Sequence, residues 1–487
     1  MLLPYLEHSR ISLDLQTLSV WAGASVRETQ AVLEELVQKR RLLRECRDGG
    51  VWYRCHGPNP GNDGELSPEA RDSLLEKCLE QGHFDEGLRL FDQSFEKPLA
   101  GEAKLLRAEF LAGAQRYGEV LKILNDKFLK SLDYKKRTKA RELLGKTLLF
   151  TGDLEPAQSH LERSLRDYEG AKDPEAAARV RLHLGILAQR RGQISEAEQN
   201  YQKVLQLDPG RPMADLLRGV GYLNWGNLFY DRGDYTEAQP RYEKALHLLT
   251  ASGHGPVTAQ AHLNFAHLKF YLGETFAAES HCRDAIRLAI QSRYPLTQGY
   301  ALLLLALLDQ ERGNAKRQGL RLAEAVELFS KTDLVFEWVQ AKINQAYYFD
   351  DQDRGEVADI SAREALKKSL ELNSPDLIAK SKLILGKVLR KNPQSLPEAA
   401  KALQEALKHF DRVKNEEVQW QVEFELGEVE RRKGNREAAL HLFDQSERTL
   451  ESLLSKLPPN LQESYLRDKK RQLVGGAKKL LKQNKNP

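Results

Sequence analysis

Apolar and polar positions follow one another along most of this 487-residue chain with the three-to-four-residue spacing of amphipathic helices. Glycines interrupt the pattern about every 40 residues, each midway between two such stretches. Glycine commonly ends a helix because it adopts left-handed backbone angles without steric cost. The pattern therefore predicts helix pairs, an A helix and a B helix joined by a tight turn, with turn glycines at Gly82, Gly152, Gly192, Gly233, Gly273, Gly313 and Gly434.

Five positions after each turn glycine, six of the seven copies carry a small residue. A small side chain is required where helix A and helix B approach closely. These positions are Gly87, Ala157, Ala197, Ala238, Ala278, Gln318 and Ala439. Gln318 is the exception, and it predicts a distorted repeat.

The clearest copy runs from Gly185 through Gly192, Ala197 and Tyr201 to Pro209. This spacing resembles the tetratricopeptide repeat (TPR), and the period of about 40 residues is longer than the usual period of about 34. Long repeats of this kind resemble those of bacterial peptide-sensing regulators, kinesin light chains and MalT-like regulators. The resemblance covers about 68–457 and implies about ten units, with starts near 68, 101, 138, 178, 219, 259, 299, 339, 379 and 420.

The predicted fold is all-α, a right-handed TPR superhelical solenoid of about ten helix-turn-helix units over 68–457. Pro458 and Pro459 end the pattern because proline breaks helices. Residues 458–487 are predicted to form a basic capping helix and tail, with the helix from Leu461 to about Leu481, since a solenoid needs an end unit with a polar outer face.

Residues 1–56 do not follow the repeat and are predicted to form a separate small module. Helical stretches are expected near 2–8 and 14–21, and Ser25 with Glu28 forms a capping box for a third helix. Asp48-Gly49 between two apolar runs predicts a β-hairpin. Three helices and a hairpin resemble the winged helix of bacterial STAND-type TPR signalling proteins, and residues 57–67 are expected to be a linker.

A winged helix can bind DNA, but the charges of this segment argue against that use. Residues 1–56 hold eight Lys/Arg and seven Asp/Glu, whereas phosphate neutralisation needs a clear basic excess. Packing or protein contact is therefore the favoured role, and Lys39-Arg40-Arg41 is the one run that could reach a phosphate.

Composition sets the class of protein. A net charge of only +4 does not favour nucleic-acid binding by the whole chain. Four scattered cysteines indicate a reducing compartment, and the longest apolar run, Tyr300 to Leu308, is too short for a membrane span of about 20 residues. We therefore expect a cytoplasmic protein without membrane contact.

No catalytic or cofactor motif stands out in the sequence. There is no G-x-x-x-x-G-K-[S/T], H-E-x-x-H or G-x-S-x-G. In the expected hairpin register, Cys46 lies opposite Val51 and Cys55 opposite Leu42, so the two cysteines are too far apart for one zinc site. Cys78 and Cys282 fit core positions, and Asp350-Asp351-Asp353 fit a solvated loop. We predict no enzymatic activity, no metal and no cofactor.

The surface expected to bind a partner is the concave face, which A helices line in a TPR solenoid. Asparagine recurs there, and its amide can both donate to and accept from a peptide backbone. TPR peptide sensors use such asparagines, whereas the alternative explanation is that these are ordinary polar residues on a solvated surface. The candidate residues are Asn224, Asn227, Tyr230, Asn264, His267, Tyr271, Asn344 and Tyr347. Leu303, Leu304 and Leu307 predict an apolar stretch that suits an amphipathic helix.

The predicted function is a non-catalytic adaptor or scaffold in bacterial signalling or regulation that binds a protein or peptide in this groove. Two alternatives stay open. The first is a DNA-binding transcription regulator with the TPR array as sensor. The second is the sensor half of a STAND-type system whose NTPase lies on a partner protein.

Overall fold

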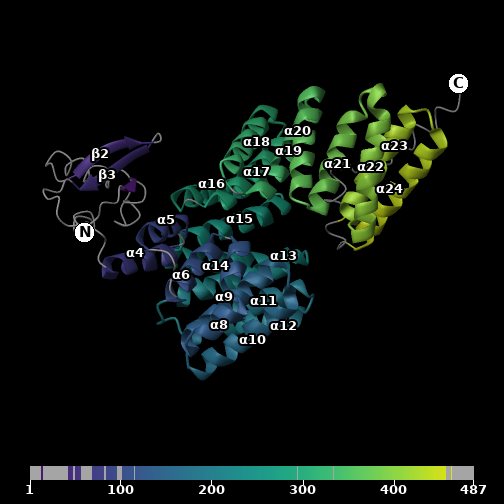
Figure 1. The fold of residues 1–487 in the computed structure, drawn as a ribbon. Coiled ribbons are helices and arrows are strands. Elements are labelled where there is room, and N and C mark those ends of the chain that lie inside the picture. Colours follow the sequence, from purple (N-terminus) through teal and green to yellow (C-terminus); the bar gives the residue numbers. More distant parts are fainter. Residues whose placement is uncertain are drawn as a thin grey trace. The chain divides into compact units, whose positions relative to one another are not determined.

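The computed structural model describes residues 13–14, 42–47, 50–55, 68–81, 84–95, 101–114, 116–292, 294–332, 334–456 and 462. Within this part of the chain, helices follow one another as ten A–B pairs (Figure 1). The predicted all-α, TPR-type fold of about ten units is therefore confirmed.

The pairs are α4 (Pro68–Gln81) with α5 (Phe84–Ser94), α6 (Gly101–Gly113) with α7 (Tyr117–Ile123), α9 (Tyr134–Thr151) with α10 (Leu154–Gly170), α11 (Pro174–Arg190) with α12 (Ile194–Leu205), and α13 (Ala214–Asp231) with α14 (Tyr235–Ser252). They continue with α15 (Gly255–Tyr271) and α16 (Thr275–Gln291), α17 (Pro295–Glu311) and α18 (Ala315–Ser330), α19 (Val335–Asp351) and α20 (Gly355–Glu371), α21 (Pro375–Leu389) and α22 (Leu396–Val413), and α23 (Glu416–Arg432) and α24 (Arg436–Lys456). A short helix α8 (Asp126–Ser131) follows α7, and a 3-10 turn η1 (Pro393–Ser395) precedes α22.

The A–B turns depend on left-handed residues, as predicted. Gly233 has φ +75°, its N–H donates to the Tyr230 carbonyl, and the N–H of Asp234 donates to the Phe229 carbonyl. This is a Schellman motif, which satisfies the last carbonyls of α13. Positive φ is also found at Gly152, Gly192, Gly273, Gly313 and Gly434, whereas Gly82 lies outside the described residues.

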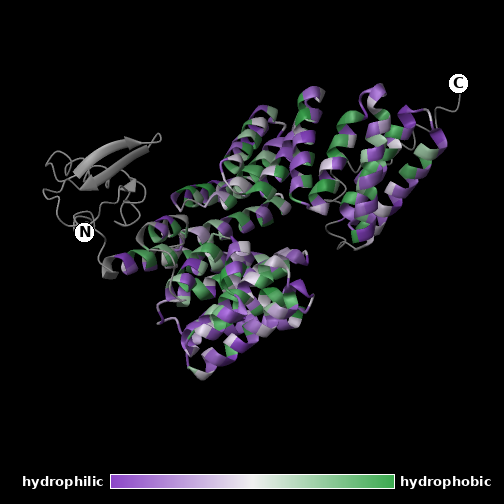
Figure 2. Cartoon of the chain, in the orientation of Figure 1, coloured by the Kyte–Doolittle hydropathy of each residue, from purple (hydrophilic) through white to green (hydrophobic). Residues whose placement is uncertain are grey.

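The A–B contact explains why small residues recur. A Cβ added to Gly226 would lie 2.7 Å from the Tyr242 ring, and one added to Gly185 would lie 2.3 Å from the Tyr201 ring. The two tyrosines are almost completely buried, as are Ala197 and Ala238. In Figure 2, hydrophobic residues recur among hydrophilic ones along the helices, as expected of helices that pack against their neighbours.

The described residues form two compact units. The first extends to Asn264 and includes 291–292, and the second runs from Phe265 to 290 and from Tyr294 onward. Within each unit, A helices of neighbouring pairs contact each other directly, as α11 does α13 and α19 does α21. The A helices therefore share one face in each unit, which we call the A-helix face.

Three strands lie near the N-terminus: β1 (Leu13–Asp14), β2 (Leu42–Arg47) and β3 (Gly50–Cys55). They pair antiparallel in the order β1-β3-β2. The hairpin prediction is confirmed in its register, because Cys46 pairs with Val51 and Leu42 with Cys55. Strand β1 occupies the first position of the helix expected over 14–21.

Other predictions near the two ends fall on residues that the structure does not describe. These are the stretch 2–8, most of 14–21, the third helix, the linker over 57–67 and the C-terminal helix from Leu461. The winged helix as a whole is therefore not tested.

One detail of the repeat prediction changes. Most A helices begin about four residues before the predicted starts, as α9 does at Tyr134 rather than 138. The extra residues make the A helices about one turn longer than expected. No helix among the described residues is both long and apolar enough to cross a membrane.

Candidate polar face of the A helices

Two of the predicted asparagines hydrogen-bond directly to each other in the first unit. The Oδ1 of Asn227 on α13 accepts from Nδ2 of Asn264 on α15 at 2.9 Å and from the Tyr242 hydroxyl at 2.8 Å. The Oδ1 of Asn264 in turn accepts from Nε2 of Gln260 at 2.7 Å. Because both lone pairs of the Asn227 oxygen are used, this residue can only donate to a ligand, while Asn264 keeps one N–H and one lone pair.

Asn224 lies one turn before Asn227 on α13 and is half-buried. Its side chain makes no hydrogen bond with any residue that the structure describes, so its whole amide can serve a ligand. Tyr230, also half-buried, lies farther along the same helix, with its ring centroid 5.6 Å from that of Tyr235. The first unit thus brings Asn227 and Asn264 together, with Asn224 one turn from Asn227 on the same helix.

The same face carries a buried ionic cluster that the sequence interpretation missed. Glu142 on α9 is 7% exposed and accepts from Arg179 Nε at 2.8 Å and Nη2 at 3.0 Å, and from the Tyr168 hydroxyl at 2.8 Å. Burial raises the pKa of Glu142, but the charge and hydrogen bonds of Arg179, with the hydrogen bond from Tyr168, together hold this pKa below its ordinary value. The signal was present in the register, because Glu142 occupies a position where other A helices carry Leu182 or Leu223.

His183 on α11 lies beside this cluster and is uncharged at neutral pH. Burial, together with the nearby Lys146 ammonium, lowers the pKa of His183 to about 3. Its Nδ1 is buried and has no hydrogen-bond partner among the described residues. Burial also lowers the pKa of Lys146. The face of the first unit therefore passes from a partly cationic region on α9 and α11 to a neutral amide region on α13 and α15.

The second unit surrounds its predicted site residues differently. Asn344 and Tyr347 are half-buried on α19, and Lys387 Nζ lies 5.0 Å from the Tyr347 ring centroid. Asp350 on the same helix is 2% exposed and lies 2.8 Å from Lys391 Nζ and 3.2 Å from Lys387 Nζ. The expectation of a solvated acidic loop is wrong for Asp350, because the long A helix brings this carboxylate into a buried ion-pair cluster.

Two more predicted residues belong to the second unit. His267 is half-buried, and desolvation lowers its pKa, while Tyr271 is 55% exposed at the end of α15. The predicted apolar stretch is wrong for Leu303 and Leu304, which are buried in the core, since the helix turns both side chains inward. Leu307 alone remains accessible, at 45%.

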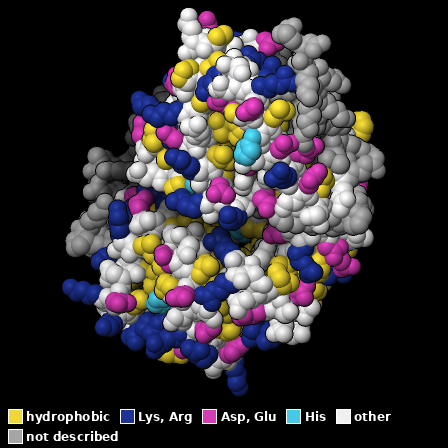
Figure 3. All heavy atoms as spheres, turned by 90° about the vertical axis from the view of Figure 1, so that its right-hand side faces the viewer, with side chains coloured by type: hydrophobic (Ala, Val, Ile, Leu, Met, Phe, Trp, Pro, Cys, Tyr) yellow, Lys and Arg dark blue, Asp and Glu magenta, His cyan; other side chains and the backbone are white. Residues whose placement is uncertain are grey.

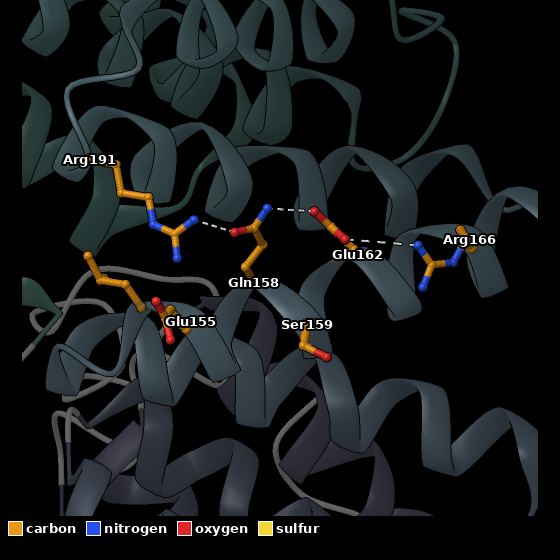
Figure 4. Close-up of a pocket in the computed structure, with 7 residues that line it drawn as sticks. Glu155, Gln158, Ser159, Glu162, Arg166 and Arg191 are labelled. Atoms are coloured by element: carbon orange, nitrogen blue, oxygen red, sulfur yellow. Dashed lines mark hydrogen bonds and ion pairs between the residues drawn. The ribbon is translucent and has the colours of Figure 1, made fainter.

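A shallow depression lies elsewhere, on the exposed side of α10 (Figure 4). Gln158 Nε2 donates to Glu162 at 2.7 Å, Arg191 donates to Gln158, and Arg166 lies 4.0 Å from Glu162. These polar groups satisfy one another along the helix, as the dashed lines in Figure 4 show. The arrangement resembles an ordinary solvated helix surface more than a small-molecule site.

Two of the four cysteines lie among the residues whose burial the structure describes. Cys78 and Cys282 are buried, as expected of core residues.

On the face that Figure 3 shows, basic and acidic side chains are interspersed among hydrophobic ones. That face has no continuous basic field of the kind that follows a phosphate backbone.

Comparison with known proteins places the repeats in a family. Residues 101–347 match the family model described as the MalT-like TPR region. No curated protein sequence matches the chain.

Among solved structures, the chain is similar to a signal-transduction ATPase of the STAND class with a tetratricopeptide repeat sensor from Pyrococcus horikoshii. The two are 12% identical with a TM-score of 0.51, over 97% of this chain and 64% of that one, so this chain spans less than two thirds of its length. The quorum sensor NprR from B. thuringiensis matches at 17% identity and a TM-score of 0.46, over 72% and 97% of the two chains. Yeast Tom70 matches at 16% and 0.43, over 86% and 90%.

Proposed function

The chain belongs to the MalT-like TPR region family, and from this premise we propose that it is a non-catalytic adaptor that binds an extended peptide or protein segment on the A-helix face of its first unit. The observation that carries the proposal is the set of three side-chain amides at Asn224, Asn227 and Asn264. These side chains belong to two neighbouring A helices, and hydrogen bonds from Tyr242 and Gln260 hold Asn227 and Asn264 in place.

Amides suit a peptide backbone because they hydrogen-bond to its N–H and C=O groups whatever its side chains are. Asn224 can accept from a backbone N–H and donate to a carbonyl, while Asn227 can donate only. Because Asn227 and Asn264 are fixed by hydrogen bonds before a ligand arrives, little side-chain entropy is lost on binding. Sequence preference would then come from neighbouring groups such as Tyr230 and the neutral imidazole of His183.

The proposal extends to a regulatory role in bacterial signalling, in the cytoplasm and without a cofactor. Similarity to a STAND protein with a TPR sensor supports a sensor role, whether the NTPase is a separate partner or not. Pull-down of the full chain from a bacterial lysate, read by mass spectrometry, tests this extension by asking whether a nucleotide-binding protein is recovered.

The peptide site itself can be tested with a phage-displayed library of random linear peptides selected on the full chain. We expect Asn224→Ala to weaken the selected peptides roughly tenfold, since losing two hydrogen bonds costs about 1.5 kcal/mol. Asn264→Ala should weaken binding as well, although it also disturbs Asn227. Dissociation constants from isothermal titration calorimetry provide the measurement.

The matched control is Gln202→Ala, which removes an exposed amide from helix B α12. It should leave binding unchanged. The proposal is wrong if Asn224→Ala binds the selected peptides as tightly as Gln202→Ala does, or if selection enriches no peptide at all.

A second proposal concerns residues 1–56, for which the antiparallel hairpin β2–β3 paired to β1 supports a winged-helix-like module. With eight basic and seven acidic residues, the module suits protein contact better than DNA. A mobility-shift assay across a salt series separates the two roles, because DNA binding would show strongly at low salt and fall as salt rises.

A further inference from the structure

The first turn of α18 has an unusual charge. It carries Lys316 and Arg317 and no acidic residue, whereas the B helices α10, α14 and α20 each carry a glutamate in the first turn. The start of a helix has a positive partial charge, so cations there are unfavourable unless an anion compensates them. From Arg312 to Arg321 the chain has four basic residues and no acidic one.

These cations gather around one buried carboxylate. Glu279 on α16 is 8% exposed and lies 2.5 Å from Arg283, 2.6 Å from Arg312 and 3.5 Å from Arg317. Arg317 also lies 3.5 Å from Asp309. Two carboxylates therefore hold three guanidiniums in position. A guanidinium offers five N–H donors, so donors remain for a further acid.

An exposed aromatic ring lies beside the same guanidiniums. Phe276 in the first turn of α16 is 84% exposed, and the guanidinium of Arg312 lies 5.2 Å from its ring centroid. Leu320, 56% exposed, follows Lys316 by one turn of α18. A single exposed apolar residue needs no explanation, but aromatic and arginine side chains together are the usual anchors of protein interfaces.

We propose that this surface, formed by Phe276, Arg283, Arg312, Lys316, Arg317 and Leu320, binds an acidic protein segment that carries an aromatic or aliphatic anchor. The carboxylates of the segment pair with Arg283, Lys316 and Arg317, and its anchor packs on Phe276 and Leu320. The surface lies in the second unit and is independent of the amide site.

The charges favour an acidic protein over a nucleic acid. Glu279 and Asp309 lie among the arginines and would repel a continuous phosphate backbone. Carboxylates on separate side chains can instead reach each guanidinium singly and form bidentate pairs.

The test uses the full chain and three fluorescein-labelled synthetic peptides measured by fluorescence anisotropy. The first alternates glutamate and phenylalanine, the second has lysine in place of glutamate, and the third has alanine in place of phenylalanine. We expect only the first to bind well, with an affinity that falls as salt rises because the pairs are exposed. Phe276→Ala should weaken it about tenfold, as loss of an anchor residue does.

Lys316→Glu should weaken the acidic peptide at least tenfold, since it replaces an attraction with a repulsion. Lys316 is exposed and makes no ion pair with any described residue, so this variant should fold normally, whereas Arg317→Glu would also repel Glu279. The controls are Lys367→Glu and Ile360→Ala, a charge reversal and an apolar truncation at exposed positions of α20. Both should bind normally.

Three outcomes would overturn the proposal. The first is that Lys316→Glu and Phe276→Ala bind the acidic peptide like the two controls. The second is that a single-stranded DNA oligonucleotide binds more tightly than the peptide and loses its affinity in Lys316→Glu, which would make the surface a nucleic-acid site. The third is loss of peptide binding in Asn224→Ala alone, which would place the acidic segment on the amide site.

Discussion

The repeats α13–α14 and α17–α18 fill the space between their two helices with different residues. In the first, Gly226 leaves room for the Tyr242 ring, and Ala238 is completely buried between the helices. In the second, the matching A-helix position is Ala306 and the matching B-helix position is Leu322, which is 3% exposed. A larger residue on one helix is therefore offset by a smaller one on the other, so the core stays filled.

The two repeats differ most at the position that follows the turn. Ala238 is completely buried in the core, whereas Gln318 is only half-buried. The distortion predicted from Gln318 is not found, because α17 and α18 are regular helices and Gly313 has the same left-handed conformation, φ +71°, as the other turn glycines. Because each repeat of a solenoid depends mainly on its neighbours, one repeat can use its first turn for contact with other molecules while the rest keep their packing.

The largest expected effect is at Tyr242. Tyr242→Ala should lower the free energy of unfolding by about 4 kcal/mol, because it leaves a cavity and removes a hydrogen bond to Asn227. Leu322→Ala in the other repeat should cost about 3 kcal/mol. Hydrogen exchange of the amides of each repeat gives the local values. If Tyr242→Ala lowers the free energy of unfolding by no more than Leu322→Ala does, the expected difference between the two repeats is contradicted.

A smaller effect is expected at the residue that faces Tyr242. Gly226→Ala should cost about 2 kcal/mol, even though alanine favours a helix, because its Cβ would lie 2.7 Å from the ring. Ala306→Gly should also destabilise, by about 1 kcal/mol, through lost helix propensity and packing. Urea unfolding followed by circular dichroism compares the two, and a stabilising Gly226→Ala would show that the ring can move away.

The smallest effect is expected at Gln318. Gln318→Ala should change stability by no more than about 0.5 kcal/mol, because the glutamine is half-buried and alanine is the better helix former. The reverse change in the other repeat, Ala238→Gln, should cost about 3 kcal/mol through overpacking. Thermal unfolding of Gln318→Ala and Ala238→Gln measures both changes in stability. If the two variants lose similar stability, the two repeats are packed alike at this position.

Most of the fold could be predicted because it depends on local rules. The turn glycines, the small residues at the A–B contact and the number of helix pairs all follow from the spacing along the chain. The hairpin register could be predicted too, because Asp48-Gly49 determines which residues lie opposite each other. The starts of the A helices were less accurate, since helix ends depend on caps such as Asp133 and Asp173.

The candidate site could be predicted only in part. The register placed Asn224, Asn227 and Asn264 on neighbouring A helices, and the structure agrees. It could not show that Asn227 Oδ1 is used by Tyr242 and Asn264, because these contacts join residues 15 and 37 positions apart. Nor could it show that Asp350 is buried and pairs with Lys387 of the next A helix and with Lys391 just after it.

The sequence alone determined that this protein consists of TPR-type helix pairs, because glycine and alanine at fixed spacing leave few other ways to pack the helices. Only the tertiary structure decided which polar side chains are already paired and which can meet a ligand. That depends on distances between helices that are separate in the chain. The charge of Glu142 is compensated by Arg179. The Asn224 amide and the Lys316 ammonium have no partner among the described residues and can therefore bind a ligand.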